Sequence, residues 1–188
     1  MWTVIVPINY GRECKTRLAS RLTLEQREKL VESMARHVLD TLASTPAIHT
    51  IRVLSAVRPP FVEQRWIKDQ GRGLNAELEA ARAELSRKPL AFIHADLPFL
   101  EVGDVENLLN AATRAGAAIA PDRHEQGTNA LAIADDRHFC PAFGPDSFAR
   151  HKAALPDAAV VSTPGLSFDI DEPECLDLAV AKGLLIPA

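Results

Sequence analysis

Short apolar runs alternate with longer helical segments along most of the chain, and this alternation restricts the fold more than any other feature. Buried strands are predicted for short runs of apolar and β-branched residues, at positions 2–6, 50–54, 90–94 and 117–120. Helices are predicted for segments with helical spacing or helix-favouring composition, at positions 24–42, 74–86 and 104–115. Strands that alternate with helices predict an α/β fold with a mostly parallel sheet and helices on both of its faces.

A helix-capping signal and several weaker elements complete this pattern. Thr23 and Gln26 form a capping box at the start of the first helix. Two weaker strands are predicted at 130–133 and 158–161, and a last helix ends near Gly183. The sequence contains no repeat, low-complexity segment or linker, so we expect a single domain over residues 1–188.

The composition excludes several classes of function. Hydrophobic residues make up 47% of the chain, enough for a full core, and the net charge of −4 argues against nucleic acid or an anionic membrane as a partner. Three widely spaced cysteines are typical of reduced thiols. The chain begins without a signal-peptide pattern and has no apolar run near the ~20 residues of a membrane helix. We therefore expect a cytoplasmic protein with a small-molecule ligand.

Two groups of carboxylates are candidates for a ligand site, because the ligands of parallel sheets bind at the carboxyl ends of strands. Asp96 comes just after the strand at 90–94, and Mg²⁺ prefers carboxylates together with phosphate oxygens. Asp169 and Asp171 are two residues apart and face the same side of an extended segment. Each group also has a structural alternative, since Asp96 could cap the next turn and Asp171 could cap the last helix with Glu174. We therefore prefer Asp169 as the second metal ligand.

A basic loop follows the first strand and suits a triphosphate, through Gly11, Arg12, Lys15 and Arg17. This loop does not have the G-x-x-x-x-G-K-[ST] pattern of a Walker A motif. Two glycines, at positions 71 and 73, precede the helix at 74–86 and are weak evidence by themselves.

Two polar loops in the second half of the chain are further candidates. Residues 122–129 lie between two strands and could equally be a plain surface loop. Residues 143–148 place a glycine and a serine before a short helix, where backbone N–H groups can bind an anion, and Asp146 could instead cap that helix.

Nucleophilic catalysis by a side chain is not indicated. The sequence has no G-x-S-x-G motif, and Cys14 has no evident base beside it. We expect His94 to be structural because it lies inside a predicted strand, whereas His124 and His151 lie close to the two polar loops.

Seven stretches together resemble the guanylyltransferases of the CofC/FbiD type, which make the phospholactyl or related unit of the deazaflavin coenzyme F-420. These stretches are residues 14–18 (CKTRL), 73–75 (GLN), 95–98 (ADLP), 121–124 (PDRH), 127–131 (GTNAL), 143–148 (FGPDSF) and 168–171 (FDID). They occur in the family's order and cover nearly the whole chain.

The resemblance implies a Rossmann-like nucleotidyltransferase fold of the GT-A kind, with GTP as cosubstrate and Mg²⁺ as cofactor. The implied metal ligands are Asp96, Asp169 and Asp171. Catalysis is assigned to Asp96 together with Lys15 and Arg17, which would face the triphosphate. The other implied nucleotide-binding residues are Pro7, Gly73 and Asn75. The residues implied to bind the phosphorylated acid are Thr128, Asn129, Gly144 and Ser147.

The family's acceptors are 2-phospho-L-lactate, phosphoenolpyruvate and 3-phospho-D-glycerate, and the sequence does not choose among them. The chain departs from the family at Asn9, where a lysine is usual, and between Ser55 and Gly71, where no acidic residue directly follows the predicted strand. Three alternatives stay open: a sugar-phosphate nucleotidyltransferase, a glycosyltransferase, or a non-catalytic nucleotide-binding protein. The sugar enzymes usually carry a D-x-D motif, whereas Leu97 and Pro98 follow Asp96 here. The oligomeric state is also open, with a homodimer as one candidate.

Overall fold

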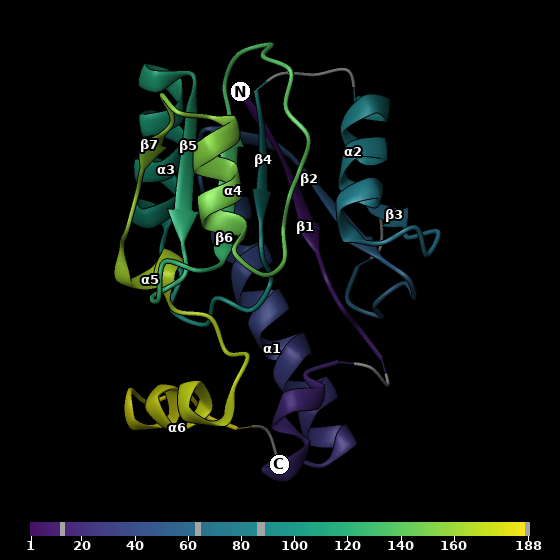
Figure 1. The fold of residues 1–188 in the computed structure, drawn as a ribbon. Helices are drawn as coiled ribbons and strands as arrows, with labels where there is room; N and C mark the ends of the chain where they lie inside the picture. The colour runs from purple at the N-terminus through teal and green to yellow at the C-terminus, as the bar shows by residue number, and fades with distance from the viewer. Residues whose placement is uncertain (12–13, 63–64, 86–88, 187–188) are drawn as a thin grey trace.

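The computed structural model describes residues 1–11, 14–62, 65–85 and 89–186. Its strands form one seven-stranded sheet in the order β3-β2-β1-β4-β6-β5-β7 (Figure 1). The strands are β1 (Trp2–Pro7), β2 (Ile48–Ser55), β3 (Trp66–Lys68), β4 (Leu90–Ile93), β5 (Ala117–Pro121), β6 (Thr128–Ile133) and β7 (Ala159–Val160). Among the described strands only β6 runs against the others, pairing antiparallel with β4 and β5. The prediction of an α/β fold with a mostly parallel sheet is confirmed.

Helices cover both faces of this sheet. They are η1 (Thr16–Ser20), α1 (Leu24–Ala43), α2 (Leu74–Leu85), α3 (Val102–Ala115), α4 (Ser147–Ala154), α5 (Pro164–Ser167) and α6 (Pro173–Ala181), with η1 a 3₁₀ turn. Figure 1 shows α2 and α4 in front of the sheet and α1 and α3 behind it. No helix among the described residues has the length and apolar character needed to cross a membrane.

Alternate side chains of β1 show why a continuous apolar run forms a strand here. Val4 and Val6 pack into the core beneath α1 and α3, whereas Ile5 packs into the core on the α2 side. All three are fully buried, as expected for a central strand of a sheet that helices cover on both faces. A third apolar cluster joins η1, α1 and α6 through residues such as Leu18, Met34 and Leu176.

The element boundaries differ from the sequence prediction in a few places. The capping box of Thr23 and Gln26 is present at the start of α1. The predicted strand at 158–161 shrinks to the two residues of β7, and β4 ends one residue before His94. The strand β3 and the turns η1 and α5 were not predicted, because each is only three to five residues long. Of the predicted residues, Arg12 and Ser86 lie outside the described ranges.

Candidate active site

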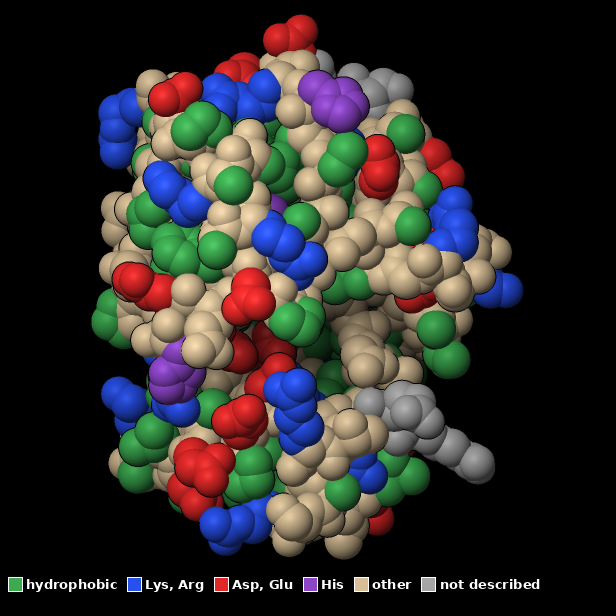
Figure 2. Space-filling view, viewed as in Figure 1, with side chains coloured by type: hydrophobic (Ala, Val, Ile, Leu, Met, Phe, Trp, Pro, Cys, Tyr) green, Lys and Arg blue, Asp and Glu red, His purple; other side chains and the backbone are tan. Residues whose placement is uncertain are grey.

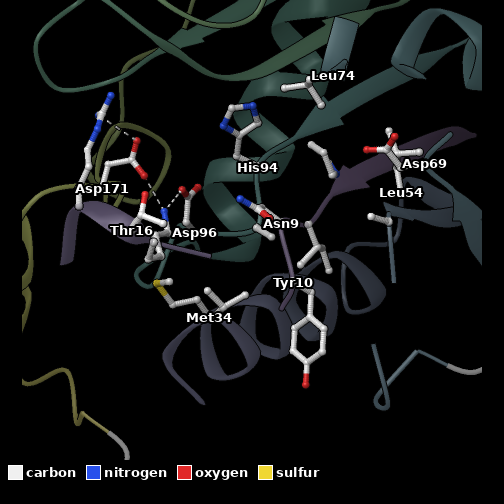
Figure 3. A pocket seen from close by; sticks show the side chains of 17 residues that line it. Asn9, Tyr10, Thr16, Met34, Leu54, Asp69, Leu74, His94, Asp96 and Asp171 are labelled. Carbon is white, nitrogen blue, oxygen red and sulfur yellow. Dashed lines mark hydrogen bonds and ion pairs between the residues drawn. The ribbon is translucent and has the colours of Figure 1, made fainter. Parts of the chain in front are cut away.

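A pocket of about 510 Å³ opens at the carboxyl ends of β1, β2 and β4 (Figure 3). The loop after β1, the turn η1 and the residues just past β4 form its wall. Of the predicted site residues it contains Pro7, Lys15, Arg17, Asp96 and Asp171. The carboxyl edge of the sheet is therefore hollowed where the strand order predicts a ligand.

Three carboxylates converge at the edge of this pocket. Asp96, Asp169 and Asp171 each offer an oxygen, and these oxygens all lie within 4.8 Å of one another. The backbone N–H of Ile170 donates to the carbonyl of Asp96 at 3.3 Å, which ties the segment before α6 to the end of β4. In the space-filling view, acidic side chains gather in the hollow between α4 and α6 (Figure 2). The structure thus brings together all three predicted metal ligands.

Lys15 lies among these carboxylates. Its Nζ is 2.5 Å from Asp96 Oδ2 and 2.7 Å from Asp171 Oδ1. Burial alone would lower the pKa of the Lys15 ammonium, but the charges of Asp96 and Asp171 raise it above its ordinary value. Burial would raise the pKa of Asp96, and the Lys15 charge overcomes this effect and lowers it. Lys15 and Asp96 are therefore both charged at neutral pH.

Asp169 is the carboxylate of the cluster that has no ion pair with Lys15 among the described residues, whereas the other two both pair with it. Burial, followed by the charge of Asp96, raises the pKa of Asp169 to about 6, although Asn129 Nδ2 donates to it at 3.3 Å. The Oδ1 atom of Asp96 is buried and has no hydrogen-bond partner among the described residues. A carboxylate held against its neighbour's charge and an orphaned carboxylate oxygen both fit a divalent cation, which prefers oxygen ligands of this kind.

Asp171 is free to join the cluster because it does not cap the last helix. The N-cap residue of α6 is Glu172, with Pro173 at the first helical position, so the structural alternative of a cap formed by Asp171 and Glu174 does not hold. Arg17 NH1 lies 3.8 Å from Asp171 and 3.9 Å from Glu172. The exposed Arg17 side chain therefore borders the cluster from the solvent side.

The residues predicted to bind the acid lie on β6 and at the start of α4. Ala142 N–H donates to His151 Nε2 at 3.0 Å, so the Nδ1 of a neutral His151 carries the proton and donates to Thr128 Oγ1 at 2.9 Å. Burial lowers the pKa of His151 to about 4 and keeps it neutral. His151 therefore positions Thr128, a role that the sequence did not indicate.

Two further predicted acid-binding residues are held by backbone groups. Asn129 Nδ2 donates to the carbonyl of Leu166 at 3.0 Å and faces Asp169 on the other side. Ser147 N–H donates to the carbonyl of Gly144 at 3.1 Å, and the Ser147 side chain is buried. None of the four predicted acid-binding residues lines the pocket of about 510 Å³, and of the four only Asn129 has a hydrogen bond to the carboxylate cluster among the described residues.

Gly73 and Asn75, predicted to bind nucleotide, do not line the pocket either. Asn75 Oδ1 accepts from Phe143 N–H at 2.7 Å, and its Nδ2 donates to the Phe143 carbonyl at 3.0 Å. Gly73 has a φ of +91° at the entry to α2, a conformation that favours glycine. Asn75 therefore fixes the loop that carries Gly144 and Ser147.

Asp122 organises the loop at 122–127 internally. Its carboxylate accepts from the backbone N–H groups of His124 and Gln126 at 3.0 Å and of Gly127 at 2.7 Å. This pattern favours the structural interpretation of the loop, and His124 is not part of the pocket.

Asp69 and His94 line the pocket and were missed as site residues. Asp69 directly follows β3, a short strand within the segment from Ser55 to Gly71 that the sequence analysis overlooked. His94 is the first residue after β4 and lies between Asp96 and Asp69 along the pocket (Figure 3). His94 precedes Asp96 by two residues, and in an extended segment side chains at this spacing face the same side, so the sequence did offer a signal that His94 lies in the pocket with Asp96.

Comparisons with known proteins agree with this geometry. The family described as guanylyl transferase CofC-like matches residues 2–180. A phosphoenolpyruvate guanylyltransferase of Sphaerobacter thermophilus is 34% identical over 92% of this chain and 89% of its own. Another protein of that name, from Chloroflexus aurantiacus, is 32% identical over 92% of this chain and 91% of its own.

Solved structures extend the likeness to the fold. A nucleotidyl transferase from Methanothermobacter superposes with a TM-score of 0.64 at 14% identity, covering 97% of this chain and 96% of that chain. A 4-diphosphocytidyl-2C-methyl-D-erythritol synthase from Anaerococcus prevotii gives a TM-score of 0.60 at 11% identity, covering 97% and 95%. The predicted nucleotidyltransferase fold and enzyme class are confirmed. The chain belongs to the CofC-like guanylyl transferase family.

Proposed function

We propose that this protein transfers GMP from GTP to a small phosphorylated carboxylic acid and releases pyrophosphate. One observation carries the proposal: Asp96, Asp169 and Asp171 meet Lys15 at the edge of a pocket of about 510 Å³. A nucleoside triphosphate fits such a pocket in size, and its phosphates need the opposite charges that a cation and Lys15 provide.

The cation is proposed to be Mg²⁺, held by Asp96, Asp169 and Asp171. When bound, it supplies positive charge that neutralises phosphate oxygens. The ionised form of Asp169 would be stabilised most, because the positive charge of a nearby cation offsets the burial and the Asp96 charge that raise the pKa of Asp169 to about 6.

The nucleotide is proposed to lie across the pocket with its phosphates toward Lys15 and Arg17. Asp69 and Leu54 then lie at the far end of the pocket, where the base would reach (Figure 3). A carboxylate can accept from the two adjacent N–H groups on the edge of guanine, which makes Asp69 our candidate for selecting GTP.

The acid is proposed to bind beside the carboxylate cluster, between Asn129 and the loop of Gly144 and Ser147. Thr128 accepts a hydrogen bond from His151, so its own hydroxyl proton is left to donate to an anion. We put phosphoenolpyruvate first among the three acids, because the relatives described above carry that name.

The chemistry needs no nucleophile from the protein. An oxygen of the acceptor phosphate, already anionic at pH 7, forms a bond to the α-phosphorus of GTP. The bond from that phosphorus to the bridging oxygen of the β-phosphate breaks, and pyrophosphate leaves. Lys15 and Arg17 act by positioning the phosphates and offsetting their charge. We assign the reaction to coenzyme F-420 biosynthesis in the cytoplasm.

Pyrophosphate release tests the proposal. Purified protein with Mg²⁺ is given GTP and each of the three acids in turn, with ATP, CTP and UTP as alternative donors. We expect release only when GTP and one acid are both present. Mass spectrometry should then find an acid joined to GMP through a diphosphate. Release with sugar phosphates but with none of the acids would overturn the proposal.

A further inference from the structure

We propose that His94 hydrogen-bonds a ribose hydroxyl of the bound nucleotide and thereby makes the enzyme selective for ribonucleotides. The proposal rests on the nucleotide-binding part of the proposed function and adds a specificity-determining residue to it.

His94 lines the pocket and carries a nitrogen that has no hydrogen-bond partner among the described residues. It lies directly after β4 and lines the candidate active-site pocket. Its Nε2 is buried without a hydrogen-bond partner among the described residues. A buried ring nitrogen without a partner is unfavourable, and a ligand that supplies the partner recovers this cost. The χ2 torsion of a histidine is broad and roughly two-fold, so the ring can exchange the places of its two edges, and thus turn a nitrogen toward the pocket, without changing its plane.

The ring itself is held in place. His94 packs against Phe143 with ring centroids 5.1 Å apart and planes at 38°. Both backbone polar groups of Phe143 are bonded to the Asn75 side chain, at 2.7 and 3.0 Å. A ring supported in this way keeps its place in the wall of the pocket, which a residue that discriminates between ligands requires.

The position of His94 along the pocket selects the ribose as its partner. Asp96 and Asp171 lie at one end of the pocket, Asp69 and Leu54 lie at the other, and His94 lies between them (Figure 3). A nucleotide has its ribose between its phosphates and its base. With the phosphates at the carboxylate end, the sugar is the part that reaches His94.

The chemistry of the two groups also matches. A neutral imidazole has one donor and one acceptor, and a ribose hydroxyl can take either complementary role. A site built to bond a hydroxyl discriminates against an analogue without it, because the protein group is then left unpaired.

The experiment compares GTP with 2′-deoxy-GTP and 3′-deoxy-GTP. Affinities are measured by calorimetry with Mg²⁺ and no acceptor acid, and kcat/KM is measured with the acid that supports turnover. We expect the wild type to lose about tenfold in both quantities with at least one deoxy analogue. His94→Phe keeps a ring against Phe143 and should bind all three nucleotides equally.

Two further variants complete the design. His94→Gln retains a donor and an acceptor and should restore part of the discrimination, and it also serves if His94→Phe fails to fold. His138→Phe, at an exposed position, is the matched control and should behave as the wild type. The proposal is overturned if the wild type binds all three nucleotides within about twofold, or if His94→Phe keeps the wild-type preference. Failure of pyrophosphate release with every acid would count against the proposed reaction, while the calorimetric arm would still decide the role of His94.

Discussion

Two neighbouring regions of the molecule solve the burial of polar side chains in opposite ways. Around His151, each ring nitrogen has a partner, with Thr128 on one side and the Ala142 N–H on the other. In the carboxylate cluster, Asp169 is held close to the charge of Asp96, and Asp96 Oδ1 has no partner among the described residues. The hydrogen bonds of the first region are complete in the protein alone, whereas the second region, although Lys15 pairs with two of its carboxylates, leaves an oxygen that the proposed cation would bind.

This difference distinguishes a region that supports the fold, around His151, from a region suited to bind a ligand, the carboxylate cluster. A satisfied network rigidifies its surroundings, and an unsatisfied one stores free energy that a ligand recovers. The two regions should therefore respond differently to mutation, pH and Mg²⁺.

The largest contrast is expected in catalysis. Asp96→Asn removes a charge from the cluster and from the ion pair with Lys15. We expect turnover to fall about 1,000-fold or more, roughly 4 kcal/mol of transition-state stabilisation, while the protein stays folded. Steady-state pyrophosphate release and circular dichroism measure the two effects. Asp157→Asn, at an exposed position, is the matched control. Turnover within tenfold of the wild type would remove Asp96 from the mechanism.

The His151 region should lose stability in acid. The pKa of His151 is about 4 in the folded protein and about 6.5 when unfolded, so the unfolded state binds the proton first as pH falls. The stability from the neutral ring is complete above pH 6.5 and decreases toward pH 4, by about 2–3 kcal/mol at pH 4.5. Urea unfolding at pH 7 and 4.5 of the wild type and of His151→Phe isolates this contribution, because the wild type should lose about 2–3 kcal/mol more than the variant as pH falls between these values. An identical decrease in both proteins would contradict it.

The carboxylate cluster should show the reverse pH dependence without metal. The pKa of Asp169 is about 6 in the folded protein, above its ordinary 3.8, so the folded state holds the proton longer as pH rises. Folding is therefore weakened as pH rises through this window, by about 2 kcal/mol between pH 4.5 and 7. Because the His151 effect has the opposite sign, the wild type alone conceals both.

Asp169→Asn isolates this contribution. In EDTA the variant should be more stable than the wild type at pH 7, with a smaller difference at pH 4.5. Added Mg²⁺ should raise the unfolding midpoint of the wild type and leave that of the variant nearly unchanged. Equal stabilisation of both proteins by Mg²⁺ would mean that the ion binds elsewhere.

The sequence predicted the fold better than the details of the site. The alternation of apolar runs and helices indicated the sheet correctly, because that pattern is local. Asp69 was missed because its strand, β3, has only three residues. The alternative of a cap at Asp171 fails because Pro173 takes the first helical position and makes Glu172 the N-cap, as the preference of proline for that position indicates. The pairing of Thr128 with His151, 23 residues apart, depends on the packing of α4 and left no local signal.

The smallest effect concerns Thr128, which belongs to both regions if it also binds the acid. Thr128→Val keeps the side-chain shape and leaves the His151 Nδ1–H without an acceptor. We expect the free energy of unfolding to fall by about 1–2 kcal/mol. The KM for the acid should also rise severalfold, because the hydroxyl proton that would reach the anion is lost. Thr128→Ser is the matched control, since it retains the hydroxyl and should restore both quantities. A drop in stability with an unchanged KM would assign Thr128 to the scaffold alone, and the boundary between scaffold and site would then lie at Asn129.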